Sequence, residues 1–472
     1  MRRIWVGALA MALAMTACGG GGAQTRTVLV DYSSDRYSNF SLYDFPGTVE
    51  VHPGTTLVFR QTWTGEPHTV TGGTAVSGVL QSSKPFLDLF TNYEYLVGNG
   101  ANLPDPESPE GSKTPFAEFV AGLKAARPAD RRDAVVNAYN TLRSRGLKLP
   151  DLDHPPAGAT FGDVNNVINQ ATDKAFRDVP SAFPQDENSN DLNQNFSQPC
   201  YLRTGMPPKD SKKACTKAEQ KQPAFDGNNS FYSSGIIPYE GPSGNTFRIP
   251  LAKNIKPGKY EFFCAVHGPQ QSVVIDVRPN NEKIPSAAQE TSEAQKQIGE
   301  HVRPLDKLFA EASRGKITID QGGGQKTTLD GPFAGVATPA EQHAAIADML
   351  PKVWTVKAGA PVTWKMMGGQ HTISFGVPPY FPPVEFLKDG TVRLNPKLTP
   401  PAGGAPKPPE QSGNGGIMKV DGGTYSGTGF WSSGFIGTDP YLEYTLRVSK
   451  PGRYRYACLL HPGMVGTLVV TP

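Results

Sequence analysis

Two short segments that lie far apart in the chain share one pattern and decide the expected fold. They read Tyr260-Glu-Phe-Phe-Cys264-Ala-Val-His267-Gly-Pro-Gln270 and Tyr454-Arg-Tyr-Ala-Cys458-Leu-Leu-His461-Pro-Gly-Met464. Each follows a Lys-Pro-Gly turn and precedes a run rich in β-branched residues, at 273–277 and 467–471. Because alternate residues of a strand share a face, each cysteine points inward at a strand end, and the tight loop after it returns a histidine to its side.

The similarity extends upstream of both cysteines. Phe231–Ile236 (FYSSGI) parallels Phe430–Phe435 (FWSSGF), and 49–59 parallels 354–364 as a strand, a turn and a second strand. Each of the latter stretches leads to a histidine in a short loop, His68 in one and His371 in the other. The sequence therefore predicts one β domain that occurs twice.

Each predicted copy offers two histidines, one cysteine and a residue that can act as a weak fourth ligand. A His2Cys set with a weak axial donor is the blue-copper arrangement, because thiolate suits Cu(I) and imidazole suits both oxidation states. The chain resembles the plastocyanin/azurin-type cupredoxins twice, over roughly 25–74 with 226–277 and over 316–376 with 417–472. The resemblance implies a mainly β fold of two Greek-key β-sandwiches that bind two type 1 copper ions.

The resemblance also implies a ligand for each position. In the second copy the three equatorial ligands and the axial ligand are His371, Cys458, His461 and Met464. In the first copy the corresponding residues are His68, Cys264, His267 and Gln270, with the adjacent Gln271 as the alternative axial residue. The competing interpretation of the first copy is a degenerate site, which would leave the second as the redox-active one.

The domain organisation follows from these copies and from the segments between them. We expect a signal peptide (1–17), a Gly-rich tether (18–24), a first cupredoxin domain (25–277) with an insertion at about 75–225, a helical connector (278–315), and a second cupredoxin domain (316–472) with a Pro/Gly-rich loop at about 377–416. Apolar residues at helical spacing predict insertion helices that start near Phe116 and cover 130–145. Ser286–Gln289 is a capping-box start for the connector, and Thr338–Glu341 predicts a further short helix.

The N-terminus predicts export. Two arginines precede an uncharged apolar run, at 4–15, which is too short to span a bilayer and fits a secretory signal. Small residues before Cys18 and four glycines after it resemble a bacterial lipobox, which implies acylation of Cys18. The predicted location is the outer face of a bacterial cytoplasmic membrane or the periplasmic side of a membrane. Disulfides persist in such settings, and Cys200 and Cys215 could close a short loop worth roughly 3 kcal/mol.

Composition excludes several classes of protein. The formal net charge of +3, from 46 basic and 43 acidic residues, argues against a nucleic-acid partner. The 51 glycines and 44 prolines exceed ordinary usage and indicate many turns and loops, which disfavours a helical bundle.

The expected function is one-electron transfer, with a cytochrome, an oxidase or a dehydrogenase as redox partner. Copper buffering or delivery at the cell surface is the alternative. We expect no enzymatic activity, because Phe263 and Ala457, and not histidines, precede the two copper cysteines, and the four remaining histidines form no His-x-His pair. An axial glutamine is a harder donor than methionine, so the first site is expected to have the lower potential.

Overall fold

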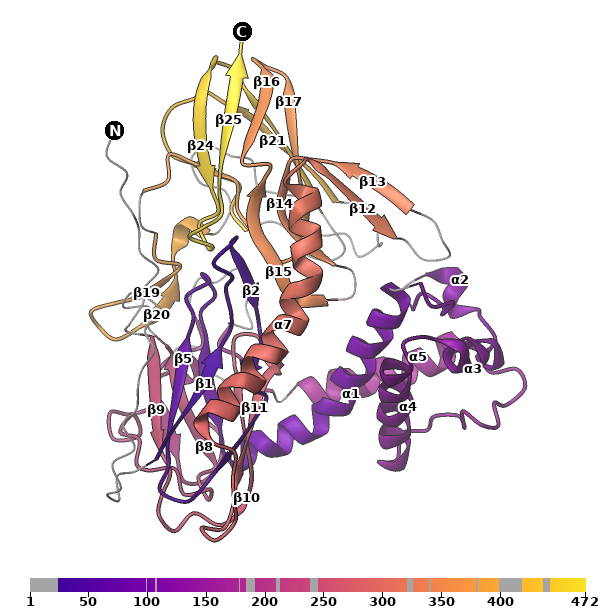
Figure 1. Cartoon of the computed structure of the whole chain (residues 1–472), viewed down its shortest axis with the longest axis vertical. Coiled ribbons are helices and arrows are strands. Elements are labelled where there is room, and N and C mark those ends of the chain that lie inside the picture. The colour runs from indigo at the N-terminus through magenta and orange to yellow at the C-terminus, as the bar shows by residue number, and fades with distance from the viewer. Residues whose placement is uncertain are drawn as a thin grey trace.

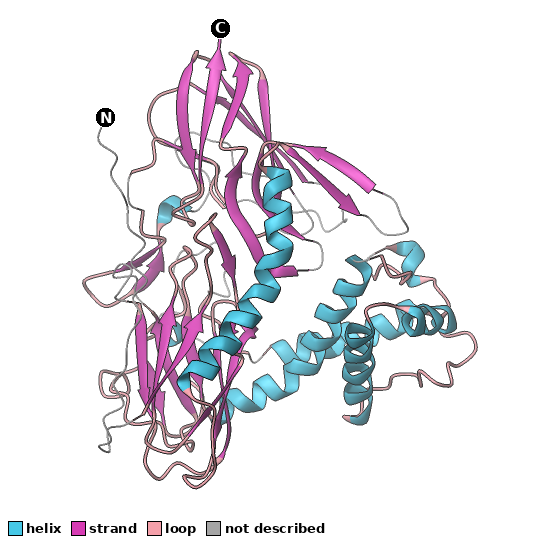
Figure 2. Ribbon diagram, in the orientation of Figure 1, coloured by secondary structure: helices cyan, strands magenta, loops and turns pink. Residues whose placement is uncertain are grey.

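Strands dominate the chain and form two β-sandwiches in the computed structural model (Figure 1). The structure describes residues 24–98, 100–106, 108–177, 179–183, 192–208, 213–237, 245–320, 326–338, 341–378, 381–398, 418–435 and 442–472. Figure 2 shows helices gathered in one insertion and in one long connector. The predicted mainly β class, with a helical insertion and a helical connector, is confirmed.

The first sandwich packs a four-stranded sheet on a six-stranded sheet. The four-stranded sheet has the order β3 (Asp44–Phe45), β1 (Thr25–Val30), β5 (Thr56–Gln61) and β9 (Thr246–Pro250). The six-stranded sheet has the order β4 (Thr48–Val51), β11 (Gly268–Val277), β10 (Gly258–Cys264), β6 (Thr69–Gly72), β8 (Phe231–Ile236) and β7 (Cys200–Leu202). Alternate apolar residues of both sheets, such as Val28, Phe59, Phe262 and Ile275, meet in one core.

The second sandwich is built in the same way. Its six-stranded sheet has the order β2 (Asn39–Ser41), β15 (Glu341–Leu350), β14 (Phe333–Thr338), β17 (Pro361–Met367), β23 (Leu442–Val448) and β21 (Met418–Tyr425). The facing sheet has the order β16 (Val353–Lys357), β25 (Val465–Thr471), β24 (Gly452–Ala457), β18 (Ser374–Phe375) and β22 (Trp431–Ser432). Two hairpins, β12 (Lys316–Asp320) with β13 (Lys326–Asp330) and β19 (Val384–Phe386) with β20 (Val392–Leu394), and the 3-10 turn η1 (Pro396–Leu398) lie outside these sheets.

One strand joins the two sandwiches. β2 comes from the N-terminal part of the chain, yet it pairs antiparallel with β15, so that Phe40 faces Ala345. Phe40 is buried in the core of the second sandwich together with Trp364 and Tyr456. The segment between β1 and β3 therefore crosses to the other sandwich and returns, which ties the two together.

In the part of the insertion that the structure describes there are six helices. They are α1 (Thr74–Gly98), α2 (Pro109–Ser112), α3 (Phe116–Ala125), α4 (Ala129–Ser144), α5 (Phe161–Phe176) and α6 (Gln194–Ser197). Of these, α1, α3, α4 and α5 share a core of their own. The predictions for α3 and α4 are confirmed, because Phe116, Phe119, Val120 and Leu123 of α3 pack on Val135 and Leu142 of α4. Helices α1 and α5 were not predicted, since Gly78 and Pro85 interrupt the helical pattern of α1.

The connector is a single helix, α7 (Ala287–Ala312), which begins at the predicted capping box of Ser286 and Gln289. It packs Ile298 on Phe45 of the first sandwich and Leu305 on Phe333 of the second (Figure 1). The short helix predicted at Thr338–Glu341 is wrong. Residues on both sides belong to the paired strands β14 and β15, where ladder hydrogen bonds and burial outweigh a local helix-start signal.

Candidate metal centres

Two clusters of histidine and cysteine lie at the ends of the sandwiches that face each other. One consists of His68, Cys264 and His267, and the other consists of His371, Cys458 and His461. In each cluster the ligand atoms lie within 4.8 Å of one another. In the described part of the chain, these are the two groups in which three or more His, Cys, Asp or Glu side chains lie close enough to hold a metal ion. The structure thus brings together the six residues that the sequence grouped as equatorial ligands.

All four histidines turn the same ring nitrogen toward their cluster. Nδ1 of His267 lies 3.5 Å from Cys264 Sγ, Nδ1 of His461 lies 3.6 Å from Cys458 Sγ, and Nδ1 of His68 lies 3.8 Å from Cys264 Sγ. Nδ1 of His371 lies 3.1 Å from Nδ1 of His461, as two ligands of one ion do. The convergence of two imidazole nitrogens and one sulfur at each site fits copper.

The outer nitrogen, Nε2, of each histidine has an oxygen acceptor. His68 donates to Asp31 Oδ2 at 3.1 Å, and His371 donates to the backbone oxygen of Gly368 at 2.6 Å. His461 donates to Glu66 Oε1 at 2.8 Å, and His267 lies 3.4 Å from Glu66 Oε2. Such partners fix the tautomer and the ring orientation, so that Nδ1 keeps its lone pair for a metal.

Matching hydrogen bonds hold the two cysteines in place. The backbone N–H of Thr69 donates to Cys264 Sγ at 3.3 Å, and that of Thr372 donates to Cys458 Sγ at 3.4 Å. Each threonine hydroxyl also accepts from the backbone N–H of the residue that follows the cysteine, Ala265 at 2.7 Å or Leu459 at 2.8 Å. The strand end that carries the first histidine is therefore fastened to the loop that carries the other two ligands.

The repeated Ser-Ser-Gly has a structural role at both sites. Ser234 accepts from the N–H of Val70 at 2.8 Å, and Ser433 accepts from the N–H of Ile373 at 2.9 Å. The glycines that follow have φ angles of 63° and 68°, which other residues adopt rarely. The serines thus support the strand next to His68 and next to His371.

Burial and charge set the protonation of the metal-free clusters. Burial raises the pKa of the Cys264 and Cys458 thiols, but the neighbouring imidazoles outweigh it and hold both pKa values well below the ordinary range. Burial lowers the pKa of His267 and His461, yet the thiolates and Glu66 raise it to about 10 in each. Each cluster is therefore a thiolate beside an imidazolium, and metal binding has to displace the imidazolium proton.

Gln271, the alternative axial residue, lies beside the first cluster, whereas Gln270, the residue that the resemblance favours, does not. Gln271 is buried, and its Oε1 lies 3.1 Å from His68 Nδ1 and 2.9 Å from His267 Nδ1. Gln270 instead donates to Thr91 on α1 at 3.2 Å. The loop after Cys264 enters β11 directly at Gly268, so the strand alternation turns Gln270 away from the site and Gln271 toward it. In the second site Met464 is fully buried in the core that contains Cys458.

Two carboxylates beneath the first site had no signal in the sequence. Asp31 is buried at a φ of 64°, and it accepts from Thr64 Oγ1 at 2.6 Å in addition to His68. Asp44 Oδ1 lies 3.5 Å from Gln271 Nε2. Burial, together with the nearby Cys264, raises the pKa of Asp44 to about 8. The two residues flank the crossing segment, Asp31 directly after β1 and Asp44 at the start of β3, and the path of that segment cannot be inferred from local patterns.

The other predicted residues have different outcomes. Cys200 and Cys215 form the predicted disulfide, which is confirmed, and it is buried against Phe231. Cys18, with the signal peptide and most of the tether, lies outside the described residues. Among the described helices none is long and apolar enough to cross a bilayer.

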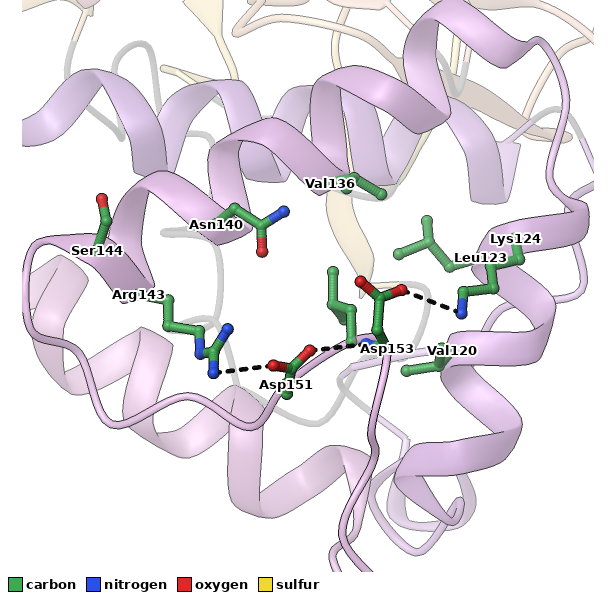
Figure 3. Close-up of a pocket in the computed structure, with 10 residues that line it drawn as sticks. Val120, Leu123, Lys124, Val136, Asn140, Arg143, Ser144, Asp151 and Asp153 are labelled. Atoms are coloured by element: carbon green, nitrogen blue, oxygen red, sulfur yellow. Dashed lines mark hydrogen bonds and ion pairs between the residues drawn. The ribbon is translucent and has the colours of Figure 1, made fainter.

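A cavity of about 550 Å³ lies within the helical insertion, away from both clusters. It opens between α3, α4 and the segment at 151–153, and it is flanked by the ion pairs Arg143–Asp151 and Lys124–Asp153 (Figure 3). None of the residues that the sequence singled out as ligands lines it.

Comparison with known proteins adds three similar solved structures. Reduced auracyanin from Roseiflexus castenholzii is 18% identical over 26% of this chain and 85% of its own, with a TM-score of 0.14. A Cu-containing nitrite reductase from Thermus scotoductus is 16% identical over 52% of this chain and 48% of its own, with a TM-score of 0.15. A blue copper oxidase from Nitrosomonas europaea is 9% identical over 95% of this chain and 86% of its own, with a TM-score of 0.16. No protein-family model and no curated protein matches the sequence.

These structures are cupredoxin-like proteins. The two His-Cys-His clusters of this chain are candidate copper sites because of the chemistry of their own donor atoms. Their TM-scores are too low to assign a residue or an activity. Two of the three are named as enzymes, which contradicts the expectation that this chain is not an enzyme.

Proposed function

We propose that the chain is a copper protein with two type 1 sites that carries single electrons outside the cytoplasm, next to a membrane. The observation that carries this proposal is the common orientation of the four histidines. Each presents Nδ1 to a buried thiolate and fixes Nε2 on an oxygen. Copper bound in such a set supplies one-electron redox chemistry.

The protein's own residues keep each site rigid. The hydroxyls of Thr69 and Thr372 accept hydrogen bonds from the loops that follow Cys264 and Cys458, which holds each loop against the strand after the first histidine. Hydrogen bonds to Ser234 and Ser433 stabilise the same two strands. Met464 and Gln271 are fully buried and close their sites from the side. A site whose ligands cannot rearrange favours fast electron exchange over metal release, which supports electron transfer over buffering or delivery.

The first site has a route of approach for a partner. The side chain of His267 is 11% exposed and lines a cavity of about 390 Å³ with Phe176, Val179 and Pro180 of the helical insertion. Little protein separates His267 from solvent, so a docked cytochrome, oxidase or dehydrogenase could exchange an electron with the first site through this histidine. The insertion then forms part of the docking surface.

A lipid on Cys18 would hold the protein at the membrane. We expect Cys18→Ser to move the protein from the membrane fraction to the soluble fraction, because acylation provides the attachment. A mutant that stays with the membranes would show that another surface anchors the chain.

The test of the proposed function is a visible absorption spectrum of the oxidised mature protein together with a copper count. We expect two copper ions per chain and intense thiolate-to-copper absorption that disappears on reduction. Colourless or easily chelated copper would contradict electron transfer and favour buffering.

A further inference from the structure

One carboxylate lies between the two metal clusters. Glu66 belongs to the loop that joins β5 to β6 in the first sandwich. Its Oε1 accepts a hydrogen bond from His461 Nε2 at 2.8 Å, and its Oε2 lies 3.4 Å from His267 Nε2. Its side chain is 12% exposed. A single side chain thus contacts one outer nitrogen of each cluster.

The Glu66 loop is fitted closely to the second sandwich. Gly65 has a φ of 107°, and a Cβ at that position would lie 2.1 Å from the backbone oxygen of Leu460. The second ligand loop therefore packs on a glycine that no other residue can replace without a shift. Phe40 of β2 stacks on the ring of His461 with centroids 5.5 Å apart, so His461 is enclosed by two segments from the N-terminal part of the chain.

Neighbouring groups also fix the Glu66 backbone. Gln61 Nε2 donates to the backbone oxygen of Glu66 at 2.9 Å, and the N–H of Glu66 donates to Thr64 Oγ1 at 3.3 Å. Thr64 in turn donates to Asp31, the carboxylate that orients His68. The carboxylate of Glu66 is thus held in a position where it reaches both histidines.

We propose that Glu66 links the two metal sites thermodynamically, so that metal at one site changes the affinity of the other. The inference rests on the proposed function, since it takes both clusters as metal sites. An ionised carboxylate accepts hydrogen bonds and donates none, and here two imidazole N–H groups share its charge. Glu66 is a positioning residue for His267 and His461.

The sign of the coupling follows from the shared charge. A divalent cation that replaces the proton on Nδ1 of one histidine adds one positive charge on that side of Glu66, which draws more of the Glu66 charge to that side. Less of the Glu66 charge then remains to stabilise a cation bound at the second histidine. The second metal therefore binds more weakly than the first, by about tenfold, within the usual range of coupling between sites.

The experiment compares binding isotherms for Co²⁺, added anaerobically and followed by thiolate-to-metal absorption. Cys264→Ala leaves the second site and Cys458→Ala leaves the first, so each variant gives the affinity of one site alone. We expect the wild-type isotherm to be broader than the sum of these two, with a final phase about tenfold weaker. An isotherm equal to the sum overturns the inference, whereas absence of thiolate absorption in both single-site variants overturns the proposed function.

A second set of variants assigns the coupling to Glu66. Glu66→Gln offers one acceptor where two are needed, and Glu66→Asp keeps the charge but is too short to reach both histidines, so in each the isotherm approaches the sum of the single sites. Glu50→Gln is the matched control, because Glu50 pairs with Arg278 on the surface of the same sandwich and contacts neither cluster. Coupling that persists in both Glu66 variants overturns the role of Glu66.

Discussion

The two metal clusters share a scaffold but differ in the charge that surrounds them. His68 of the first site has a buried carboxylate, Asp31, on its outer nitrogen, whereas His371 of the second has a backbone oxygen. Asp44 lies beneath the first site only, next to Gln271. The repeated ligand pattern therefore determines where a metal binds, and the unrepeated residues determine how the two sites differ.

Hydrogen bonds to sulfur differ in the same direction. Cys264 Sγ accepts the N–H of Thr69, while Cys458 Sγ accepts from both Thr372 and Leu460, each at 3.4 Å. Donors to the thiolate withdraw charge and favour Cu(I), and a nearby ionised carboxylate favours Cu(II). A Gln271 amide would be a harder donor than the Met464 thioether, so we expect all three features to lower the potential of the first site relative to the second.

The largest expected effect is the loss of one site at a time. Cys264→Ser and Cys458→Ser should each lower the copper content from two ions per chain to one and remove one thiolate band. The reason is that an alcohol does not replace a thiolate as a soft ligand. Metal analysis and visible spectra of the two variants check this. Full colour in the double variant would falsify the assignment of both sites.

The axial residues should account for most of the difference in potential. Gln271→Met should raise the potential of the first site, and Met464→Gln should lower that of the second, by about 59 mV for each tenfold change in relative Cu(I) and Cu(II) affinity. Gln270→Met is the control and should change little, because Gln270 contacts Thr91 and not the site. Redox titration in the single-site Cys→Ser backgrounds measures each value. A higher potential at the first site than at the second would contradict this prediction.

Asp31 should make a smaller contribution that is confined to the first site. Asp31→Asn removes a buried negative charge next to His68, so the first potential should rise by less than in Gln271→Met while the second stays unchanged. The same titrations measure both. An equal shift at both sites would mean that the substitution acts through the fold and not through His68.

Asp44 should make the stability of the metal-free protein depend on pH. Its folded pKa, about 8, exceeds its ordinary value of 3.8, so the folded state binds the proton more tightly. Its contribution to stability is therefore fully present below about pH 4 and is lost as the pH rises to 8, with a slope of up to about 1.4 kcal/mol per pH unit. We expect Asp44→Asn to flatten this slope in urea titrations from pH 5 to 8. An unchanged slope would show that another group is responsible.

Local sequence determined much of each site. The Cys-x-x-His loop at the end of a strand places two groups by chain geometry alone, so Cys264, His267, Cys458 and His461 could be found by spacing. Helices α3, α4 and α7 were predictable for the same reason, since caps and apolar spacing act within a few residues. The helix predicted to start at Thr338–Glu341 is the exception, because the pairing of strands β14 and β15 outweighs the local helix-start signal there.

The tertiary structure alone decided what surrounds the ligands. Glu66 and His461 are 395 residues apart in sequence, and Asp31 reaches His68 from a segment that leaves its own sandwich to pair with β15. Such contacts depend on how the two sandwiches dock, which no local pattern encodes. The repeat thus specified two similar sites, and the packing of one sandwich on the other made them unequal and placed one carboxylate between them.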